Sequence, residues 1–348
     1  MSDSSPSRMA AKGSAPSFSL VRLLLEGRAF FALIAIVAVF SWLSPNYLTV
    51  SNLLIMASHV AIYGILAIGM LLVILNGGID LSVGSVLALC GVLAGAMMQG
   101  VELKLFGVIL FPPVWAVVVL TCVIGGLVGA LNGTLIAWFK VPAFVATLGV
   151  MYVARGVALL QTNGLTYNNL SGRPELGNTG FDWLGFNRLA GIPISVIVLA
   201  TIAVLTGLML SRSSFGRWLY ASGGNERAAD LSGVPVKRVK ITVYTISGIL
   251  AAVAGLVLSS QLTSAGPTAG TTYELTAIAA VVIGGAALTG GRGTVRGTML
   301  GAFVIGFLSD GLVIIGVSSY WQTVFTGAVI VLAVLMNSIQ YGKGGRKT

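Results

Sequence analysis

The feature that most constrains this chain is a series of about ten long apolar runs, which together cover most of its 348 residues. A helix needs about 20 mostly apolar residues to cross a bilayer, and in lipid only helices and closed barrels satisfy every backbone polar group. The runs lack the alternation of apolar and polar residues that barrel strands show. The sequence therefore predicts an all-α polytopic membrane protein. The predicted spans are 29–43, 52–75, 81–98, 114–139, 141–160, 192–210, 241–261, 275–288, 298–316 and 321–339.

Composition supports a membrane protein and excludes most other classes. Hydrophobic residues make up 56% of the chain and charged residues 9%, against about 25% charged in a soluble domain. A water-soluble fold has too few polar residues here to cover its exterior, which excludes soluble enzymes and nucleic-acid binders. The two cysteines, Cys90 and Cys122, both lie in apolar runs, so we expect buried free thiols instead of disulfides.

The placement of the basic residues predicts the orientation of the spans. If the amino terminus is cytoplasmic and the spans alternate, 16 of the 20 Lys and Arg residues fall on the cytoplasmic side. The positive-inside rule predicts such a bias, so both termini are expected in the cytoplasm and the net charge of +10 is an orientation signal. The predicted organisation is a disordered cytoplasmic tail (1–28), one transmembrane domain (29–340) and a cytoplasmic tail (341–348). The domain includes an outer loop (161–191), which is either a partner surface, a lid or a tolerated insertion, and a long cytoplasmic loop (211–240).

The cytoplasmic loop contains a short segment with strong helix signals at both ends, GGNERAADLSGVP at 223–235. Asn225 suits an N-cap, and Glu226 in the first turn complements the helix dipole. Gly233 suits the C′ position, and Pro235 prevents continuation. A helix of two turns is unstable alone in water, so this one must dock. Its support is either the cytoplasmic face of the protein itself or a partner chain.

Polar residues interrupt the apolar sequence at a few places, and these are the candidates for a translocation path. The segment 76–85 (NGGIDLSVGS) places a carboxylate, an amide and hydroxyls between two spans, and polar groups at membrane depth indicate function. Asp80 either lines the path or caps the following helix. Single polar residues inside spans either line the path or join helices by hydrogen bonds. The residues assigned to the path are Asn76, Asp80, Ser82, Ser85, Asn132 and Thr147.

Two further features concern charge and symmetry. Arg155 and Asp310 lie within apolar runs, where they either pair with each other or, for Arg155, extend to an interface. The segments 77–87 and 290–300 match at five of eleven positions, four identical, including the leading glycines, and one Ser/Thr, which suggests a duplicated 5+5 architecture. Gly125 and Gly129 form one of several GxxxG spacings that allow helices to approach closely.

Several kinds of chemistry lack the residues they need. The sequence has no GxxxxGK[ST] phosphate loop, and its glycine-rich turn at 290–297 lacks the lysine. There is a single histidine, His59, and no cluster of His, Cys and carboxylates with metal-ligand spacing. We therefore assign no catalytic residue, no metal and no cofactor to this chain, and ATP with its Mg²⁺ would bind a partner subunit.

Four motifs in order, 76–85, 129–149 (GALNGTLIAWFKVPAFVATLG), 223–234 and 268–280 (TAGTTYELTAIAA), resemble the permease subunit of bacterial sugar ABC importers of the ribose/xylose/arabinose/galactoside type. The resemblance covers about 43–335. It implies a non-enzymatic transport subunit of the inner membrane that imports a sugar by alternating access. The implied partners are a cytoplasmic ABC ATPase, an extracytoplasmic sugar-binding protein and a second permease subunit, in a homodimer.

The resemblance also implies that the short helix at 225–233 is a coupling helix that sits in a groove of the ATPase. The residues assigned to this contact are Gly224, Asn225, Glu226, Arg227, Ala229, Asp230 and Gly233. Asp230 stands where related chains often carry a basic residue, and 162–166 lacks an expected proline. The rival interpretation is a secondary transporter that uses Asp80 and Asp310 as proton or sodium sites. A path of hydroxyls and amides suits a neutral pentose such as ribose, a hexose or a sugar alcohol.

Overall fold

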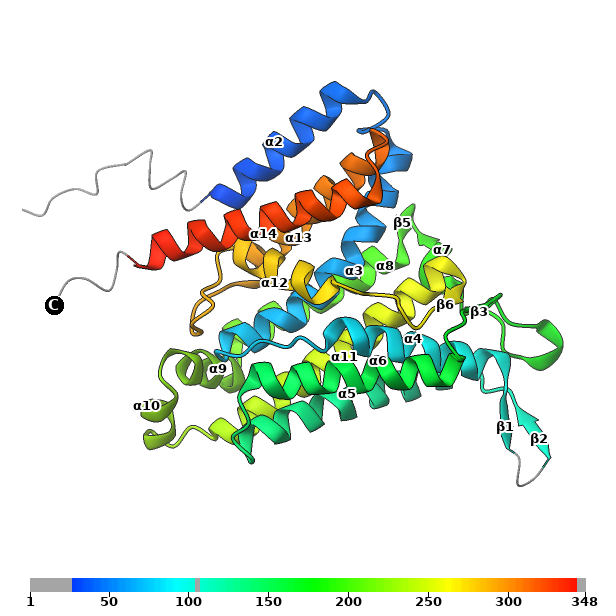
Figure 1. Ribbon diagram of the computed structural model, residues 1–348, viewed down its shortest axis with the longest axis horizontal. Coiled ribbons are helices and arrows are strands. Elements are labelled where there is room, and N and C mark those ends of the chain that lie inside the picture. Colours follow the sequence, from blue (N-terminus) through cyan, green and yellow to red (C-terminus); the bar gives the residue numbers. More distant parts are fainter. Residues whose placement is uncertain (1–26, 104–106, 343–348) are drawn as a thin grey trace, which may run out of the picture.

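Each predicted apolar run lies on a helix of the computed structural model, which describes residues 27–103 and 107–342 (Figure 1). The predicted tail at 1–28 therefore lies almost entirely outside the described residues, as does most of the tail at 341–348. The helices that carry the runs are α2 (Arg28–Leu43), α3 (Val50–Leu75), α4 (Val83–Gln99), α5 (Val114–Ala137), α6 (Ala143–Thr162), α8 (Ile194–Arg212), α11 (Val236–Leu262), α12 (Tyr273–Ile283), α13 (Val295–Ile314) and α14 (Ser319–Gly342).

Helix length and composition identify a polytopic membrane protein. Six helices in the described part of the chain are long and apolar enough to cross a bilayer: α3, α5, α6, α8, α11 and α13. The described parts of α2, α4, α12 and α14 are shorter but also apolar. The number of crossings and the side of each terminus stay predictions.

Two long helices, α3 and α11, form the centre of the bundle. The apolar window of α3 is 83% buried and that of α11 is 67% buried, whereas α5, α6 and α8 are each 28% buried. Gly125 and Gly129 of α5 lie directly against the backbone of α11, so that a side chain at either position would collide with it. This confirms that the predicted glycine spacing serves close helix packing. The helices with little internal burial expose apolar side chains, as expected of surfaces that face lipid.

Two of the shorter helices follow segments of irregular backbone. Residues 76–82 connect α3 to α4, and residues 263–272 connect α11 to α12. The two segments meet where Gly84 of α4 packs against the carbonyl of Gly270. Predicted span 275–288 is shorter in the structure, since α12 ends at Ile283 before Gly284 and Gly285, the latter with a φ of +89°.

The outer loop 161–191 is folded onto the end of the bundle. Its strand β3 (Tyr167–Asn168) pairs with β6 (Ser264–Ala265), which follows α11, and Phe181 is fully buried. This loop is therefore an anchored part of the structure, which is visible beside α4 and α11 in Figure 1. The remaining short elements are β1 (Val101–Leu103), β2 (Val108–Leu110), a 3₁₀ turn (Pro174–Leu176), α7 (Trp183–Phe186), β4 (Arg188–Leu189) and β5 (Ile192–Pro193).

Candidate functional site

The long loop between α8 and α11 contains two short helices, α9 (Ser214–Gly224) and α10 (Glu226–Leu231). Asn225 caps α10, because its Oδ1 accepts a hydrogen bond of 3.0 Å from the Ala228 N–H. At the other end Gly233 has a φ of +81°, and its N–H donates to the Asp230 carbonyl while the Val234 N–H donates to the Ala229 carbonyl. These bonds form a Schellman motif, so both predicted ends of the helix are confirmed.

The helix α10 is attached to the bundle on one side and exposed on the other. Lys240 of α11 donates to both carboxylate oxygens of Glu226, at 2.7 and 2.8 Å. Ala229 is only 5% exposed, so this member of the predicted coupling set packs inward. The other members are exposed: Gly224, Asn225, Glu226, Arg227, Asp230 and Gly233.

Leu231 is a further exposed residue of α10 that the sequence analysis did not single out. Its side chain is 83% exposed, beside the exposed Asp230 and Ser232.

Three glycine-containing segments meet beside α9, and we call this contact the glycine junction: residues 75–77, 222–223 and 290–291. The Gly291 N–H donates to the Leu75 carbonyl at 2.9 Å. A Cβ on Gly223 would overlap the same carbonyl and would lie 2.7 Å from the Gly291 nitrogen. Only a residue without a side chain allows these three backbones to touch.

Side chains reinforce the glycine junction. The Asn76 amide donates to the Ser222 hydroxyl at 2.9 Å, and the Tyr220 hydroxyl donates to the Gly293 carbonyl at 2.8 Å. The junction therefore fixes α9, and through it α10, to the end of α3 and to the turn between α12 and α13. The two glycine turns that the sequence matched as repeats, at Gly77 and Gly290, are in direct contact here. The 5+5 duplication itself stays a prediction.

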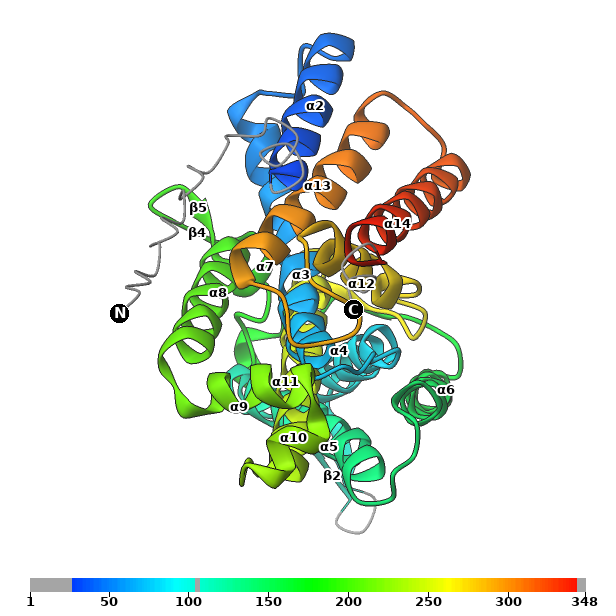
Figure 2. The same ribbon diagram turned by 90° about the vertical axis from the view of Figure 1, so that its left-hand side faces the viewer.

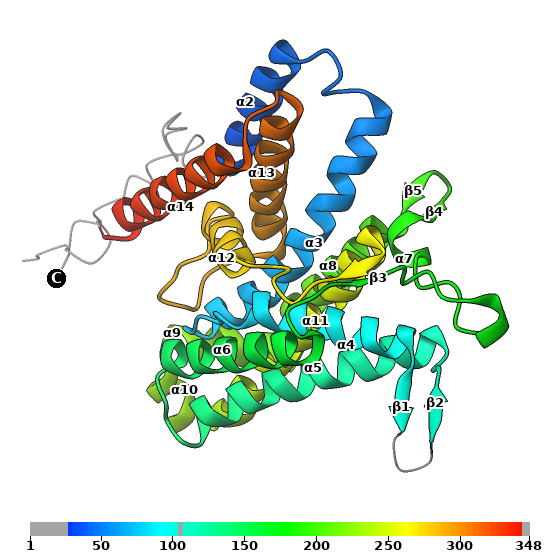
Figure 3. The same cartoon turned by 45° about the vertical axis from the view of Figure 1, so that its right-hand side comes forward.

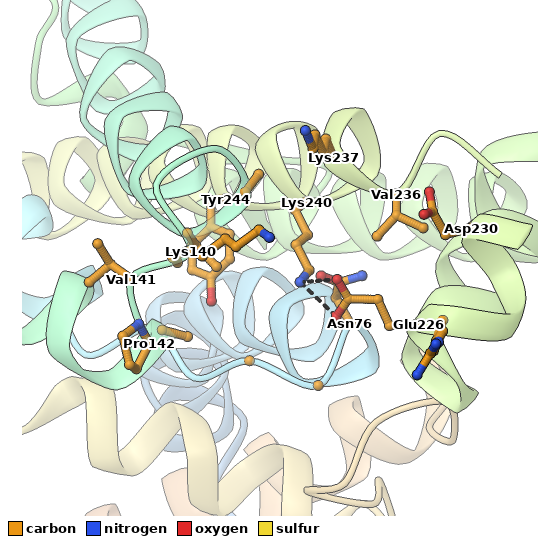
Figure 4. A pocket seen from close by; sticks show the side chains of 16 residues that line it. Asn76, Lys140, Val141, Pro142, Glu226, Asp230, Val236, Lys237, Lys240 and Tyr244 are labelled. Carbon is orange, nitrogen blue, oxygen red and sulfur yellow. Dashed lines mark hydrogen bonds and ion pairs between the residues drawn. The ribbon is translucent and has the colours of Figure 1, made fainter.

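A cavity of about 660 Å³ lies between α10 and the bundle (Figure 4). Four parts of the chain line it: the segment after α3, the turn between α5 and α6, α10, and the first turns of α11. Lys140 and the Glu226–Lys240 pair carry charges at its wall, and Tyr244 lies deeper, as Figure 4 shows. The Tyr244 hydroxyl is buried without a hydrogen-bond partner among the described residues and lies against Gly78. Any movement of α10 relative to α3 changes the shape of this cavity.

Beyond Gly78, a buried polar network ties the segment 76–82 to neighbouring helices. Asp80 is 1% exposed, and its Oδ1 accepts bonds from the Ser82 N–H at 3.0 Å and the Ser82 hydroxyl at 2.6 Å. Its Oδ2 accepts from Ser247 of α11 at 3.0 Å, and Asn132 of α5 donates to the Ser82 hydroxyl at 2.9 Å.

This network shows what the residues assigned to the path do in the present conformation. Asn132 and Thr147 are fully buried and tie α5 and α6 to the segment 76–82. Asn132 bonds Ser82, and the Thr147 hydroxyl donates to the Ile79 carbonyl at 3.3 Å. Asp80 bonds the N–H of Ser82, the residue that precedes the first turn of α4, and so also orders the start of that helix. Ser82 and Ser85 are buried as well, whereas Asn76 lines the cavity. Whether any of them meets a substrate stays a prediction.

The suggested pairing of Arg155 with Asp310 is wrong. Arg155 of α6 donates from Nη1 to the carbonyls of Pro267 and Ala269, at 2.5 and 2.9 Å. Asp310 of α13 instead lies 2.9 Å from Nδ1 of His59 on α3. The helices α6 and α13 are well separated in Figure 2, and each charged group has found a partner nearer to it.

The electrostatic neighbour of Arg155 is Glu274 in the first turn of α12. The sequence analysis missed Glu274 because it immediately precedes the predicted span that begins at 275. Its motif, TYEL within 268–280, was quoted for the resemblance but received no role.

The family described as "Branched-chain amino acid transport system / permease component" matches residues 52–334. The chain therefore belongs to this permease family, and it is a multi-pass protein of the bacterial cytoplasmic membrane, of the sugar ABC importer type that its motifs resemble.

The matches to curated relatives extend over nearly the whole length of both chains. The chain is 42% identical over 315 residues to the ribose import permease protein RbsC of Escherichia coli K12, which covers 90% of this chain and 94% of that protein. It is 46% identical over 310 residues to RbsC of Bacillus subtilis, covering 88% and 91%. It is 36% identical over 363 aligned positions to the xylose transport system permease protein XylH of E. coli K12, covering 88% and 90%. No solved structure matches the chain significantly.

Proposed function

We propose that this chain is the pore-forming subunit of an ATP-driven sugar importer and that α10 is the point where a separate cytoplasmic ATPase acts on it. The observation that supports this proposal is the way in which α10 is attached to the rest of the subunit. The helix is capped at both ends, joined to α11 through Glu226–Lys240 and joined through α9 to the glycine junction, while Leu231 is exposed. A displacement of α10 would be passed to α11 and α9 through these contacts, and the exposed face of α10 is open to a partner.

The contacts give a continuous route from α10 into the membrane domain. A displacement of α10 moves α9, which is fixed at the glycine junction to the end of α3 and to residues 290–291. The segment 76–82 begins at that junction and ends in the Asp80 network, which reaches α5 and α11. ATP hydrolysis on the partner would thereby alter the packing of α4 against its neighbours, which is the kind of change that alternating access requires.

For the substrate we propose a neutral pentose, with ribose favoured over xylose. The motivation is the higher identity to the two ribose permeases, 42% and 46%, than to the xylose permease, 36%. A soluble sugar-binding protein would deliver the sugar to the outer end of a homodimer, where the anchored loop 161–191 offers a folded surface. ATP and Mg²⁺ would bind the partner ATPase, and this chain would hold no cofactor.

The geometry does not favour the ion-coupled alternative. Both carboxylate oxygens of Asp80 accept hydrogen bonds from this chain, and Asp310 is paired with His59. Asp80 therefore presents no open coordination site in this conformation, whereas Oδ2 of Asp310 is buried without a hydrogen-bond partner among the described residues, so the alternative depends on Asp310 alone.

The coupling role is tested by Leu231→Asp in the permease purified with its ATPase. We expect loss of the complex and of sugar-stimulated ATP turnover, because a charge replaces the exposed apolar contact. Leu165→Asp is the matched control for assembly with the ATPase, since Leu165 is 71% exposed and far along the chain from α10; its ATP turnover is measured without the binding protein, to which its loop is assigned. Unchanged assembly and ATP turnover in Leu231→Asp would remove α10 from the interface.

A further inference from the structure

The irregular segment between α11 and α12, residues 263–272, reaches deep into the bundle. The helix α12 has 11 residues, which at 1.5 Å per residue is about 16 Å, half the thickness of a bilayer core. The turn that follows α12 ends in the glycine junction, at the same end of the bundle as α10. The start of α12 therefore lies about 16 Å along the helix from that turn, and Figures 1 and 3 show the segment running inward from β6 to this point.

Part of this segment is exposed. Thr268, Thr271 and Thr272 are exposed in the subunit, as is Leu275 at 45%. Thr272 has a φ of +70°, so the chain is not helical here. Irregular backbone at membrane depth is not stable against lipid, because lipid offers no hydrogen bonds. It occurs only where protein covers it or where it lines a water-filled space.

Arg155 stabilises the segment from α6. It supplies donors to the carbonyls of Pro267 and Ala269, which lie on both sides of Thr268. Glu274 in the first turn of α12 is the electrostatic neighbour of Arg155. The rings of Tyr63 and Tyr273 pack with their centroids 5.1 Å apart.

We infer that the hydroxyl surface at 268–272 contacts the sugar in the translocation path. This inference rests on the proposed function. Hydroxyls exchange hydrogen bonds with a neutral polyhydroxylated substrate without a fixed charge that would hold it. The residues first assigned to the path do not offer this surface here, because Asp80, Ser82, Asn132 and Thr147 are buried inside the subunit.

Cysteine accessibility tests the location of the surface without measuring transport. Thr271→Cys is made in a chain whose two native cysteines are replaced by Ala, and the assembled transporter in liposomes is exposed to a charged, water-soluble thiol reagent. We expect Thr271→Cys to react, and excess ribose with loaded binding protein and ATP to slow the reaction. The control is Thr201→Cys, an exposed position on the apolar helix α8 that we expect to face lipid and stay unlabelled.

Substitution of the hydroxyls tests contact with the sugar. Thr268→Val with Thr271→Val removes two hydroxyls, of which that of Thr271 also donates to the Thr268 carbonyl at 2.7 Å, and we expect ribose uptake to fall about tenfold. The matching Ser variants keep the hydroxyls and should stay within about threefold of the parent. Thr201→Val serves as the lipid-facing control.

The outcomes separate this inference from the proposed function. If Thr271→Cys is as unreactive as Thr201→Cys, the segment is covered by dry protein and the inference is overturned. Normal uptake by the double Val variant would likewise exclude contact with the sugar. If the parent transporter fails to import any sugar with ATP, the proposed function is wrong, whereas labelling at Thr271 still reports whether the segment lines a water-filled path.

Discussion

The glycine junction predicts a sharp difference between two adjacent glycines. In Gly223→Ala the new Cβ would overlap the Leu75 carbonyl and would lie 2.7 Å from the Gly291 nitrogen, whereas ordinary contact begins at 3.4 Å. The Gly291 backbone would have to retreat by about 0.7 Å (3.4 − 2.7) and the Leu75 carbonyl by more, which strains or breaks the hydrogen bond between them. Overpacking costs about 1 to 3 kcal/mol and the lost bond about 1 kcal/mol, so we expect a destabilisation of about 2 to 4 kcal/mol.

The matched control is Gly224→Ala. Gly224 is the next residue along α9, and a Cβ there meets nothing within 4 Å. Thermal unfolding of the purified chain in detergent should give a Tm lower by about 3 to 5 °C for Gly223→Ala and unchanged within about 1 °C for Gly224→Ala. Equal Tm values for the two variants would refute the junction as a close backbone contact.

Two further predictions concern the polar contacts behind α10. Asp80→Ala leaves the buried hydroxyls of its network without their acceptor, which should lower the free energy of unfolding by about 3 kcal/mol. The control Asp230→Ala, at an exposed position, should lower it by less than about 0.5 kcal/mol, which is about the noise of a denaturation curve in detergent. Glu226→Lys should lower sugar-stimulated ATP turnover with a Tm change of about 1 °C, because half-exposed ion pairs contribute little stability. Restoration of turnover by the exchanged pair Glu226→Lys with Lys240→Glu would show that the contact matters, and failure of the exchange would contradict that role.

The sequence predicted those features that depend on neighbouring residues. The caps of α10 follow from Asn225 and Gly233, each acting within one turn. The helical form of the apolar runs follows because every backbone polar group in lipid must be hydrogen-bonded within the segment. Both signals are local, so they could be read without knowledge of the fold.

The features that the sequence analysis missed depend on packing between distant segments. Asp80 and Ser247 are 167 positions apart, and nothing near Asp80 indicates which helix supplies its second donor. Arg155 took its partners from carbonyls exposed by an irregular segment, which a hydropathy pattern does not show. The glycine match between 77–87 and 290–300 suggested a duplication, which stays a prediction. It did not indicate that Gly77 and Gly290 lie in direct contact.

The central claim is that this chain carries sugar across the membrane with energy supplied by a separate ATPase. The most direct measurement is uptake of radiolabelled ribose into liposomes that contain the permease and its ATPase, with the binding protein on the outside and ATP inside. The account predicts uptake that requires ATP and both partner proteins and that persists when proton and sodium gradients are abolished. Uptake by the permease alone, driven by an ion gradient, would contradict it.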